Sequence, residues 1–547
     1  MKQIRYYMLA GMAMMTMAFV GCTEDDSMSH YMQDEASGSS GRNTDIDDVI
    51  SALETIPEVH NVKTEYDEDN EALYYTFYFK QPVDHYHPEQ GTYSQYCQLK
   101  FKGWDNNVVV YTHGYNLSTR DVDLATLMDA NQLNIEHRYF GNSLPEPFEN
   151  TNMTYLNADQ QSRDIHNIAK ALKTLFKTGH WVTTGTSKDG ITSALQAYYS
   201  DLNGWQDFDA HVPFCAPFLT GTTYSDGTFS CNDISIGTYL KDVCGSGYEA
   251  GTAEAIACER LRHIPWLVCT NKTVRDMAIT ACYTSSPESY ARIVEQFNNH
   301  STFSTGDLTK DLTAFAIQTY YWALYDKFAY VPYTLWAKIV PDTTPLENGT
   351  ATGDEWSFFM SFFTMKDKDL TNYLKSISLL ESNVAQGATR SVTEEMWEFL
   401  IFRRADESAP YYIQAFTELG SMDLDYSIVN NSGYLTDADC AKVNYIFTNQ
   451  HSYEEAGAQG IYKQDRGQLM KNFRSWAETE TTQPIIFVYA YNDPWTGGSI
   501  GDAVKNNPMI EKVIDYTSTH ADYILNRNSY QKESEQAITS ALNKFLQ

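Results

Sequence analysis

The sequence predicts an α/β fold: a mostly parallel sheet covered by helices, with a large and mostly helical insertion late in the chain. A short apolar run at 108–111 is typical of a buried parallel strand, and the run at 132–136 is a second candidate for one. A helical pattern at 157–179 separates the second run from a third at 181–184, and this alternation of strand, helix and strand indicates a parallel sheet. From about residue 220 to 480 the alternation stops and aromatic helical stretches replace it.

The N-terminal residues are expected to be an export signal and not part of the fold. Lys2 and Arg5 precede an apolar run at 6–20, and small residues stand just before Cys22, which is the pattern of a bacterial lipoprotein cleavage box. We therefore predict a signal peptide over 1–21 and a lipid on Cys22. A plain secretory signal or a single-span anchor is the alternative, although about 15 apolar residues are short for a spanning helix.

Residues 22–48 are acidic and rich in Ser and Gly, which predicts a flexible tether between the lipid and the folded domain. The acidic run at 24–26 resembles the surface-export signal of some outer-membrane lipoproteins. The expectation is an exported bacterial lipoprotein of the cell envelope, at the outer-membrane surface if the acidic run acts as that signal. The folded core then comprises 49–219 and 481–547, and the insertion comprises 220–480.

Charge and composition exclude several classes of partner. The 547 residues include 71 acidic and 39 basic side chains, which gives a formal net charge of −32. Such a surface repels nucleic acid and anionic lipid headgroups, so the membrane is expected to be contacted only through the N-terminal lipid. The sequence contains no phosphate-cradling loop of the Walker or dinucleotide type and no paired C-x-x-C spacing, so no cofactor and no metal are expected.

The cysteines predict disulfides in one part of the chain. Six of the nine lie between Cys215 and Cys282. Export implies an oxidising compartment, where disulfides are the usual fate of such a cluster. The sequence leaves their connectivity open.

The folded part opens with two segments rich in aromatic and β-branched residues. These segments, 73–80 and 96–102, predict a pair of antiparallel edge strands. The apolar run at 108–111 follows, and the loop after it contains Gly114, which allows a backbone to approach a substrate closely.

The strand at 181–184 leads into a turn with Ser187 at its tip and then into an amphipathic helix. This arrangement predicts a nucleophile elbow, in which a strand ends in G-x-S-x-G and the helix that follows directs its positive end at the serine. Gly185 fills the first glycine position, but Asp189 stands at the second, and Gly190 comes one residue later. A side chain at 189 must therefore fit where strand and helix nearly touch.

An elbow of this kind predicts an α/β-hydrolase fold and the place of its oxyanion hole. In that fold one backbone N–H comes from the residue after the nucleophile, here Lys188, and another from the loop after the 108–111 strand. We expect the second donor to be Gly114 or Tyr115 and leave the choice open. His113 precedes the serine, which is the wrong order for the catalytic base of this fold, so we expect it to fix the loop.

The acid and the base are expected near the C-terminus. Asp493 follows an aromatic and β-branched run at 484–490, and the acid of this fold stands at the end of a late strand. Of the thirteen histidines only His520 lies beyond Asp493, so the order serine, acid, histidine selects it as the base. Asp515 or Asp522 could replace Asp493 as the acid, but neither follows a clear apolar strand.

Four motifs carry a resemblance to a known family: QPVDHYHP, EHRYFGNSLPEP, YLNADQQSRD and GTSKDG, in this order and spacing. The chain resembles the secreted bacterial tripeptidyl and tetrapeptidyl aminopeptidases, which are α/β-hydrolase serine peptidases related to prolyl carboxypeptidases. The likeness runs from about residue 50 to the C-terminus, strongly in the first third and the last tenth. Asp189 departs from the family pattern, which has a second glycine at this position.

The resemblance implies an exopeptidase that acts on peptide substrates and carries its insertion as a lid over the active site. The segment YIQAFTELG at 412–420 resembles a lid motif of the wider family, and its Glu418 is the first candidate to pair with the terminal ammonium of a substrate. Glu136 is the second candidate. A buried ammonium needs such a partner, although a structural role for Glu418 is the open alternative.

Three functions are consistent with the sequence. The first is an aminopeptidase that releases tri- or tetrapeptides through an acyl-enzyme on Ser187. The second is another hydrolase on the same fold, such as a prolyl-type carboxypeptidase or an esterase. The third is a surface binding lipoprotein whose altered elbow has lost catalysis. Labelling by a fluorophosphonate separates the third from the other two, because that reagent needs an activated serine.

Overall fold

The protein was analysed as a computed structural model, which describes residues 40–68, 71–117, 121–144, 153–218, 222–223, 229–230, 232–233, 249–283, 304–328, 340–363, 409–419, 421–422, 427–436, 438–440, 468–520, 522 and 532–547. The chain divides into two compact units, Met1–Pro57 and Glu58–Gln547. In the first unit helix α2 (Ser40–Leu53) covers residues 40–48 of the predicted tether, so that part is helical. Cys22 and the predicted signal peptide lie outside the described residues.

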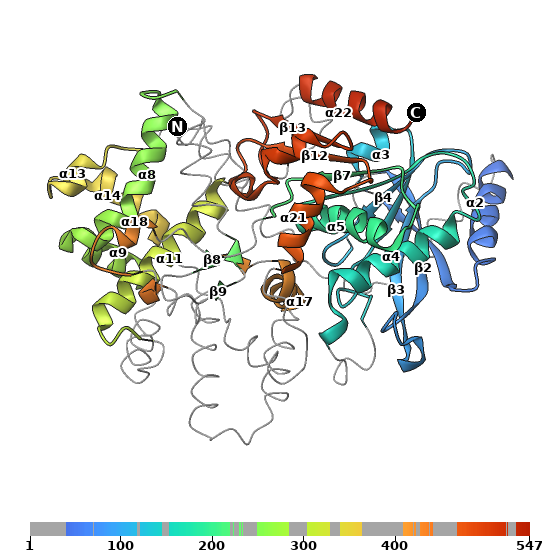
Figure 1. Cartoon of the computed structure of the whole chain (residues 1–547), viewed down its shortest axis with the longest axis horizontal. Helices are drawn as coiled ribbons and strands as arrows, with labels where there is room; N and C mark the ends of the chain where they lie inside the picture. Colours follow the sequence, from blue (N-terminus) through green and yellow to red (C-terminus); the bar gives the residue numbers. More distant parts are fainter. Residues whose placement is uncertain are drawn as a thin grey trace, which may run out of the picture. The chain divides into compact units, whose positions relative to one another are not determined.

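One nine-stranded sheet organises the second unit (Figure 1). Its strands, in spatial order, are β1 (Val59–Asp67), β2 (Ala72–Pro82), β3 (Thr92–Lys100), β5 (Asn131–Ile135), β4 (Val108–Thr112), β6 (Trp181–Thr186), β7 (Ala210–Phe214), β12 (Ile485–Ala490) and β13 (Ile510–Asp515). The pairings from β1 to β5 are antiparallel, and those from β5 to β13 are parallel. This topology confirms the α/β-hydrolase fold and the predicted antiparallel pair, to which β1 adds an edge strand that the sequence did not indicate.

Helices cover both faces of the sheet because β12 is apolar on both sides. Ile485, Phe487 and Tyr489 share one buried cluster with α5 (Lys188–Asn203) and α21 (Gln468–Thr479). The alternate residues Ile486 and Val488 share the opposite cluster with α3 (Asp123–Leu127) and α22 (Lys532–Phe545), as the two layers in Figure 1 show. Helix α21, which lies within the predicted insertion 220–480, packs on α5 and so against the helical layer of the sheet.

The helix between β5 and β6 forms as its capping signal predicts. Helix α4 (Ala158–Leu172) begins after Asn157, whose side-chain Oδ1 accepts the Gln160 N–H at 2.9 Å. Its apolar face buries Ile165, Ile168 and Leu172. The helix ends earlier than the predicted Gly179. It connects β5 to β6, which pairs in parallel with β4.

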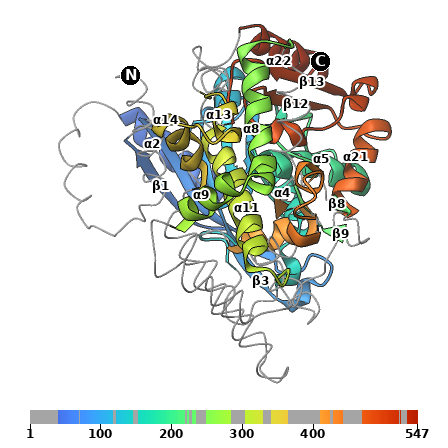
Figure 2. The same ribbon diagram turned by 90° about the vertical axis from the view of Figure 1, so that its left-hand side faces the viewer.

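The described part of the insertion is mostly helical. It contains α8 (Ala253–Thr270), α9 (Lys272–Tyr283), α11 (Leu308–Phe328), α13 (Thr344–Glu347), α14 (Gly353–Met360), α17 (Ala409–Gln414), a π-helical turn η6 (Ala415–Leu419) and α18 (Ser427–Asn430), with short strands such as β10 (Asn232–Asp233) and β11 (Ser421–Met422). Helices α8, α9 and α11 lie side by side in Figures 1 and 2 and share one hydrophobic cluster.

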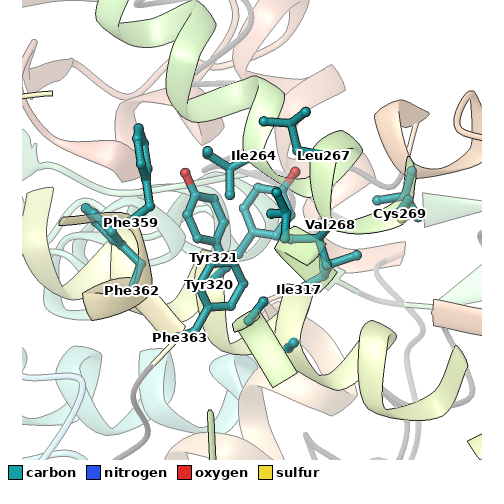
Figure 3. Close-up of a cluster of buried hydrophobic side chains, with 14 of the residues drawn as sticks. Ile264, Leu267, Val268, Cys269, Ile317, Tyr320, Tyr321, Phe359, Phe362 and Phe363 are labelled. Atoms are coloured by element: carbon teal, nitrogen blue, oxygen red, sulfur yellow. The ribbon is translucent and has the colours of Figure 1, made fainter. Parts of the chain in front are cut away.

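Aromatic residues fill the centre of this cluster. Tyr320 packs against Phe363, with ring centroids 5.2 Å apart, and its hydroxyl donates to the Leu261 carbonyl at 2.9 Å (Figure 3). Every residue of α11 from Asp311 to Tyr321 is buried, so the part of this helix that the structure describes at 319–321 is core. In the described parts of the chain, no helix has the length and apolarity that crossing a membrane requires.

The expectation of disulfides is wrong for the four cysteines of the 215–282 cluster that the structure describes. Cys215, Cys258, Cys269 and Cys282 are buried free thiols. Three of them belong to the hydrophobic cluster of the insertion, where a thiol packs as a small apolar side chain. Cys231 and Cys244 lie outside the described residues.

Candidate active site

Ser187 adopts the strained backbone that a nucleophile elbow requires. Its φ is 62° and its ψ is −123°, in a region that non-glycine residues rarely enter. The turn is held by two backbone hydrogen bonds: the Ser187 N–H donates to Phe214 O at 2.8 Å, and the Ile191 N–H donates to Ser187 O at 2.9 Å. Ser187 therefore stands at the carboxyl edge of the parallel strands, at the N-terminus of α5.

Two glycines permit this close turn. A Cβ on Gly185 would lie 2.4 Å from the backbone of Asp189, and one on Gly190 would lie 2.7 Å from Phe214 O. Side chains at either position would collide with backbone that cannot move aside. Gly190 thus allows helix α5 to pack closely against strand β7. Gly185 allows the Asp189 backbone to pack directly against strand β6.

The predicted acid and base form a hydrogen-bonded pair. Asp493 is fully buried, and its Oδ2 accepts from His520 Nδ1 at 2.8 Å. Its Oδ1 accepts the Trp495 N–H at 2.9 Å, which fixes the carboxylate. A carboxylate on Nδ1 holds the tautomer whose Nε2 can take a proton from a nucleophile. Among the described residues, no hydrogen bond joins the Ser187 hydroxyl to His520; such bonds often tighten only when substrate binds.

The two alternative acids have other partners. Asp515 Oδ1 accepts the N–H groups of Thr517 and Ser518, which shapes the turn after β13. Asp522 Oδ2 accepts the N–H and the hydroxyl of Thr519, which stabilises the loop that carries His520. Both carboxylates hold the backbone of the histidine loop, and Asp493 is the one that meets the imidazole.

A thiol that the sequence reasoning did not single out also faces this pair. The Cys215 thiol, the Asp493 carboxylate and the His520 imidazole place one ligand atom each within 4.8 Å of one another, the one such group of possible metal ligands among the described residues. Burial and the Asp493 charge raise the pKa of the Cys215 thiol well above its usual value. Since His520 Nδ1 bonds to Asp493, we assign the group to the acid and base. The sequence did contain a signal for this position, because Cys215 directly follows strand β7 at the sheet edge that carries the site.

The insertion reaches the base through one aromatic ring. The Trp495 ring lies 4.4 Å from the His520 ring, measured between centroids, and also packs against the helical cluster of the insertion. The ring therefore excludes water from one side of the imidazole. It also joins the loop after β12 to the core of the insertion.

The oxyanion loop differs from the expectation at one residue. The Gly114 N–H donates to Asp189 Oδ1 at 2.6 Å, so it is directed at that carboxylate and we withdraw its assignment as an oxyanion donor. The Tyr115 N–H and the Lys188 N–H stay as predicted donors. The Nδ1 of His113 lies 3.9 Å from Asp189 Oδ2, and its loop-fixing role stays a prediction.

The side chain of Lys188 is buried beside the same loop. Its ammonium donates to the Gly114 carbonyl and lies over the rings of Tyr115, Phe140 and Tyr411, with ammonium-to-centroid distances of 5.1, 4.6 and 6.0 Å. Burial lowers the pKa of Lys188 to about 7, against the raising effect of the Asp189 and Glu418 carboxylates. A cation so enclosed is stabilised by the aromatic faces and by its carbonyl partner.

Both carboxylates expected to bind a substrate ammonium accept hydrogen bonds from the protein itself. Glu136 is 2% exposed and accepts from the Leu117 N–H, the Asn142 N–H and the Ser143 hydroxyl, and its burial raises its pKa to about 7. Glu418 is 6% exposed, and its Oε1 accepts the Ala158 N–H at 2.7 Å. The first carboxylate ties the oxyanion loop to the loop after β5. The second caps helix α4 from the insertion.

Arg138 of the EHRYF motif has a structural role. Arg138 is fully buried and donates to both oxygens of Asp164, from Nε at 2.7 Å and from Nη2 at 2.9 Å. His85 bonds to Asp164 Oδ1 at 2.7 Å, and the Tyr93 hydroxyl donates to Oδ2 at 2.7 Å. The ion pair between Arg138 and Asp164 is thus buried and hydrogen-bonded, and it fixes the loop after β5 against α4.

Comparison with known proteins finds a family and several similar chains. Residues 42–238 match the sequence model of the PS-10 peptidase S37 family, which confirms the resemblance drawn from the motifs. This segment contains Ser187 and Lys188 and ends before Asp493. A prolyl tri/tetrapeptidyl aminopeptidase of Streptomyces mobaraensis is 35% identical over 135 residues, which are 24% of this chain and 28% of that protein.

A second curated relative is the serine protease vicPb of Bipolaris victoriae (strain FI3), 30% identical over 167 residues, which are 24% of this chain and 31% of that protein. The chain thus aligns with less than a third of each relative's length. Among solved structures, proline iminopeptidase of Mycobacterium smegmatis aligns over 86% of this chain and 98% of its own, with 10% identity and a TM-score of 0.32. The esterase LipA of Xanthomonas oryzae aligns over 89% and 96%, with 11% identity and a TM-score of 0.30.

Proposed function

We propose that this chain, whose residues 42–238 match the model of the peptidase S37 family, is a serine peptidase that releases short peptides of three or four residues from the N-terminus of peptide substrates. One observation carries the proposal. A serine with φ of 62° stands at the N-terminus of α5, and a buried Asp493–His520 pair stands after neighbouring strands of the same sheet edge. The relative from Streptomyces mobaraensis supports the amino-terminal specificity.

The chemistry follows from these roles. Ser187 attacks the peptide carbonyl while the neutral imidazole of His520 takes the hydroxyl proton at Nε2, and Asp493 stabilises the imidazolium that forms. The Lys188 and Tyr115 N–H groups bind the oxyanion of the tetrahedral intermediate, each worth roughly 3 kcal/mol in the transition state. The imidazolium then gives its proton to the leaving amine, and water, deprotonated by His520, hydrolyses the acyl-enzyme.

The cellular setting is part of the proposal. The signal over 1–21 and the lipid on Cys22 would hold the enzyme at the cell envelope, with peptides arriving from outside as substrates. Replacing Cys22 by Ser should abolish labelling by radioactive palmitate and move the protein from the membrane fraction to the soluble fraction. Labelling that survives in the Cys22→Ser variant would contradict the lipoprotein assignment.

Three versions of one peptide test which end of the substrate is read. A limit of three or four residues requires a closed pocket on the amino-terminal side, where a free ammonium is recognised and an acetyl group is not. We expect N-acetylation to lower kcat/KM by at least about 100-fold and C-terminal amidation to change it little, as measured by mass spectrometry of the products. Equal cleavage of the acetylated and free peptides, or dependence on a free C-terminal carboxylate, would favour the carboxypeptidase or esterase alternative.

A further inference from the structure

The two peptide units that flank the Gly114 Cα are both held by side chains of the helix that follows Ser187. The Gly114 N–H donates to the carboxylate of Asp189, and the Gly114 carbonyl accepts from the ammonium of Lys188. These two side chains belong to the residues directly after Ser187. The first turn of α5 therefore fixes the direction of two consecutive peptide planes in the oxyanion loop.

Sterics explain why such a hold is needed. A Cβ on Gly114 would lie 2.7 Å from Lys188 Cγ and 2.9 Å from the Lys188 backbone carbon, so only glycine fits this approach. Glycine is also the residue with the greatest freedom in φ and ψ. Gly114 therefore cannot set the direction of its own peptide planes. Hydrogen-bond partners have to set that direction.

The geometry of a trans peptide links this hold to catalysis. The carbonyl of Gly114 and the N–H of Tyr115 belong to one planar unit and point in opposite directions. When the Lys188 ammonium holds that carbonyl, the Tyr115 N–H is turned away from Lys188 Nζ. Rotation of this peptide would exchange a donor for a carbonyl oxygen at the oxyanion position, where a negative dipole would repel the developing charge.

We propose that Lys188 and Asp189 are positioning residues that clamp the Gly114–Tyr115 peptide, so that the Tyr115 N–H is a preformed donor of the oxyanion hole. The inference rests on the proposed function insofar as it needs an oxyanion. It gives a task to Asp189, which stands at the second glycine position of the elbow pattern. It also gives Lys188 two separate tasks: its backbone N–H is an oxyanion donor, and its side chain orients the other donor.

The neighbouring contacts restrict the loop but do not replace the clamp. The His113 N–H donates to Ile135 O at 3.1 Å, and the His137 N–H donates to Tyr115 O at 3.2 Å. These bonds fix the peptides on either side. The Gly114 carbonyl lies between them, and the hydrogen bond described for it comes from Lys188.

Side-chain substitutions test the clamp because they leave the Lys188 N–H in place. Lys188→Met keeps the length and the apolar contacts of the side chain but removes its donor. We expect kcat on an activated p-nitrophenyl ester to fall about 100-fold, the loss that follows removal of one oxyanion donor, with KM changed less than about 3-fold. The affinity for a peptide aldehyde, whose hemiacetal oxygen occupies the oxyanion hole, should fall by the same factor. The affinity for the leaving peptide, whose new N-terminus lies outside the oxyanion hole, should not change.

Two comparisons exclude a purely structural effect. Lys512→Met is the matched control, because Lys512 is a partly buried lysine on β13 whose ammonium donates to a backbone carbonyl, Ile500 O, at 2.7 Å. It should leave kcat and aldehyde affinity unchanged. Asp189→Asn retains an oxygen that can accept the Gly114 N–H and should lose less than about 5-fold in kcat, whereas Asp189→Ala should lose at least about 10-fold.

The outcomes separate this proposal from the proposed function. If Lys188→Met binds the aldehyde as tightly as the wild type, or if KM and product affinity change along with kcat, the clamp is wrong even if the wild type releases tripeptides. If the wild type hydrolyses the ester and shows the expected variant effects but cleaves no peptide at its N-terminus, the clamp stands and the aminopeptidase assignment is wrong. A wild type that reacts with neither ester nor aldehyde would overturn both. Should Lys188→Met fail to fold, the Asp189 pair decides.

Discussion

At the scale of single residues, the hydrogen bond between Asp493 Oδ2 and His520 Nδ1 predicts how each member of the site contributes. Ser187→Ala and His520→Ala should each lower kcat by about 10⁴-fold or more, and the double variant should be little worse, because the residues act as a unit. Asp493→Asn should also be severe, since an amide at that place favours the wrong tautomer of the imidazole. Steady-state kinetics on one peptide substrate measures all four variants.

Asp522→Asn is the matched control for the acid. Asp522 accepts from Thr519 in the loop of the base, and an amide oxygen can still accept those bonds, so the loss should stay below about 10-fold. If Asp493→Asn retained most of the activity while Asp522→Asn did not, the assignment of the acid would have to be exchanged.

The buried carboxyl of Glu136 predicts a pH dependence of stability. Its pKa is raised to about 7 by burial, above the reference value of 4.5, so between these values the folded protein holds a proton that the unfolded chain has released. Stability must then fall as pH rises from about 4.5 to 7. Relative to Glu136→Gln, the free energy of unfolding of the wild type should decrease by up to about 3 kcal/mol across this range, as measured by urea titration. Glu89→Gln, at an exposed carboxylate, is the control, and a flat difference for Glu136→Gln would contradict the prediction.

At the scale of elements, Glu418 joins the π-helical turn of the insertion to the N-terminus of α4. Its Oε1 accepts the Ala158 N–H and the side-chain amide of Gln414, both at distances below 3 Å. Removing this acceptor leaves a buried donor at a helix N-terminus without its partner, which costs about 1–3 kcal/mol. Glu418→Ala should therefore lower the free energy of unfolding by that amount. Glu418→Gln should lower it less, because the amide oxygen can still accept while the favourable charge at the helix N-terminus is lost.

The same variants decide whether Glu418 also binds substrate. With a structural role alone, the ratio of kcat/KM between free and N-acetylated peptides should be the same in Glu418→Gln as in the wild type. A collapse of that ratio towards one would restore the expectation, drawn from the resemblance, that this carboxylate pairs with the substrate ammonium.

At the scale of the whole molecule, the sequence predicted what local patterns encode. Apolar runs located β4, β6 and β12, the Asn157 cap located the start of α4, and the chain order of the fold selected the pair that the structure joins. Strand β1 was not predicted because it is an edge strand with polar residues along most of its length. The structural roles of Asp189 and Glu418 were not predicted for another reason. Their partners Gly114 and Ala158 are 75 and 260 residues away in the chain, and composition carries no information about such contacts.

The cysteines show the limit of arguing from composition, and they yield the last prediction. An oxidising compartment favours disulfides in general, yet Cys215, Cys258, Cys269 and Cys282 are buried as free thiols. Burial raises the pKa of Cys269 to about 11 and also raises those of Cys215 and Cys282, which keeps these three thiols protonated and unreactive. The stability of the insertion then comes from the aromatic packing around α11.

Dithiothreitol should therefore leave the Tm unchanged within about 1 °C, since no bond among these four would be broken. Iodoacetamide should modify none of them in the native protein and all of them after unfolding without reductant, as read by peptide mass spectrometry. A disulfide-linked peptide that contains any of the four, or a Tm that falls on reduction together with such a link, would show that covalent bonds and not packing hold the insertion.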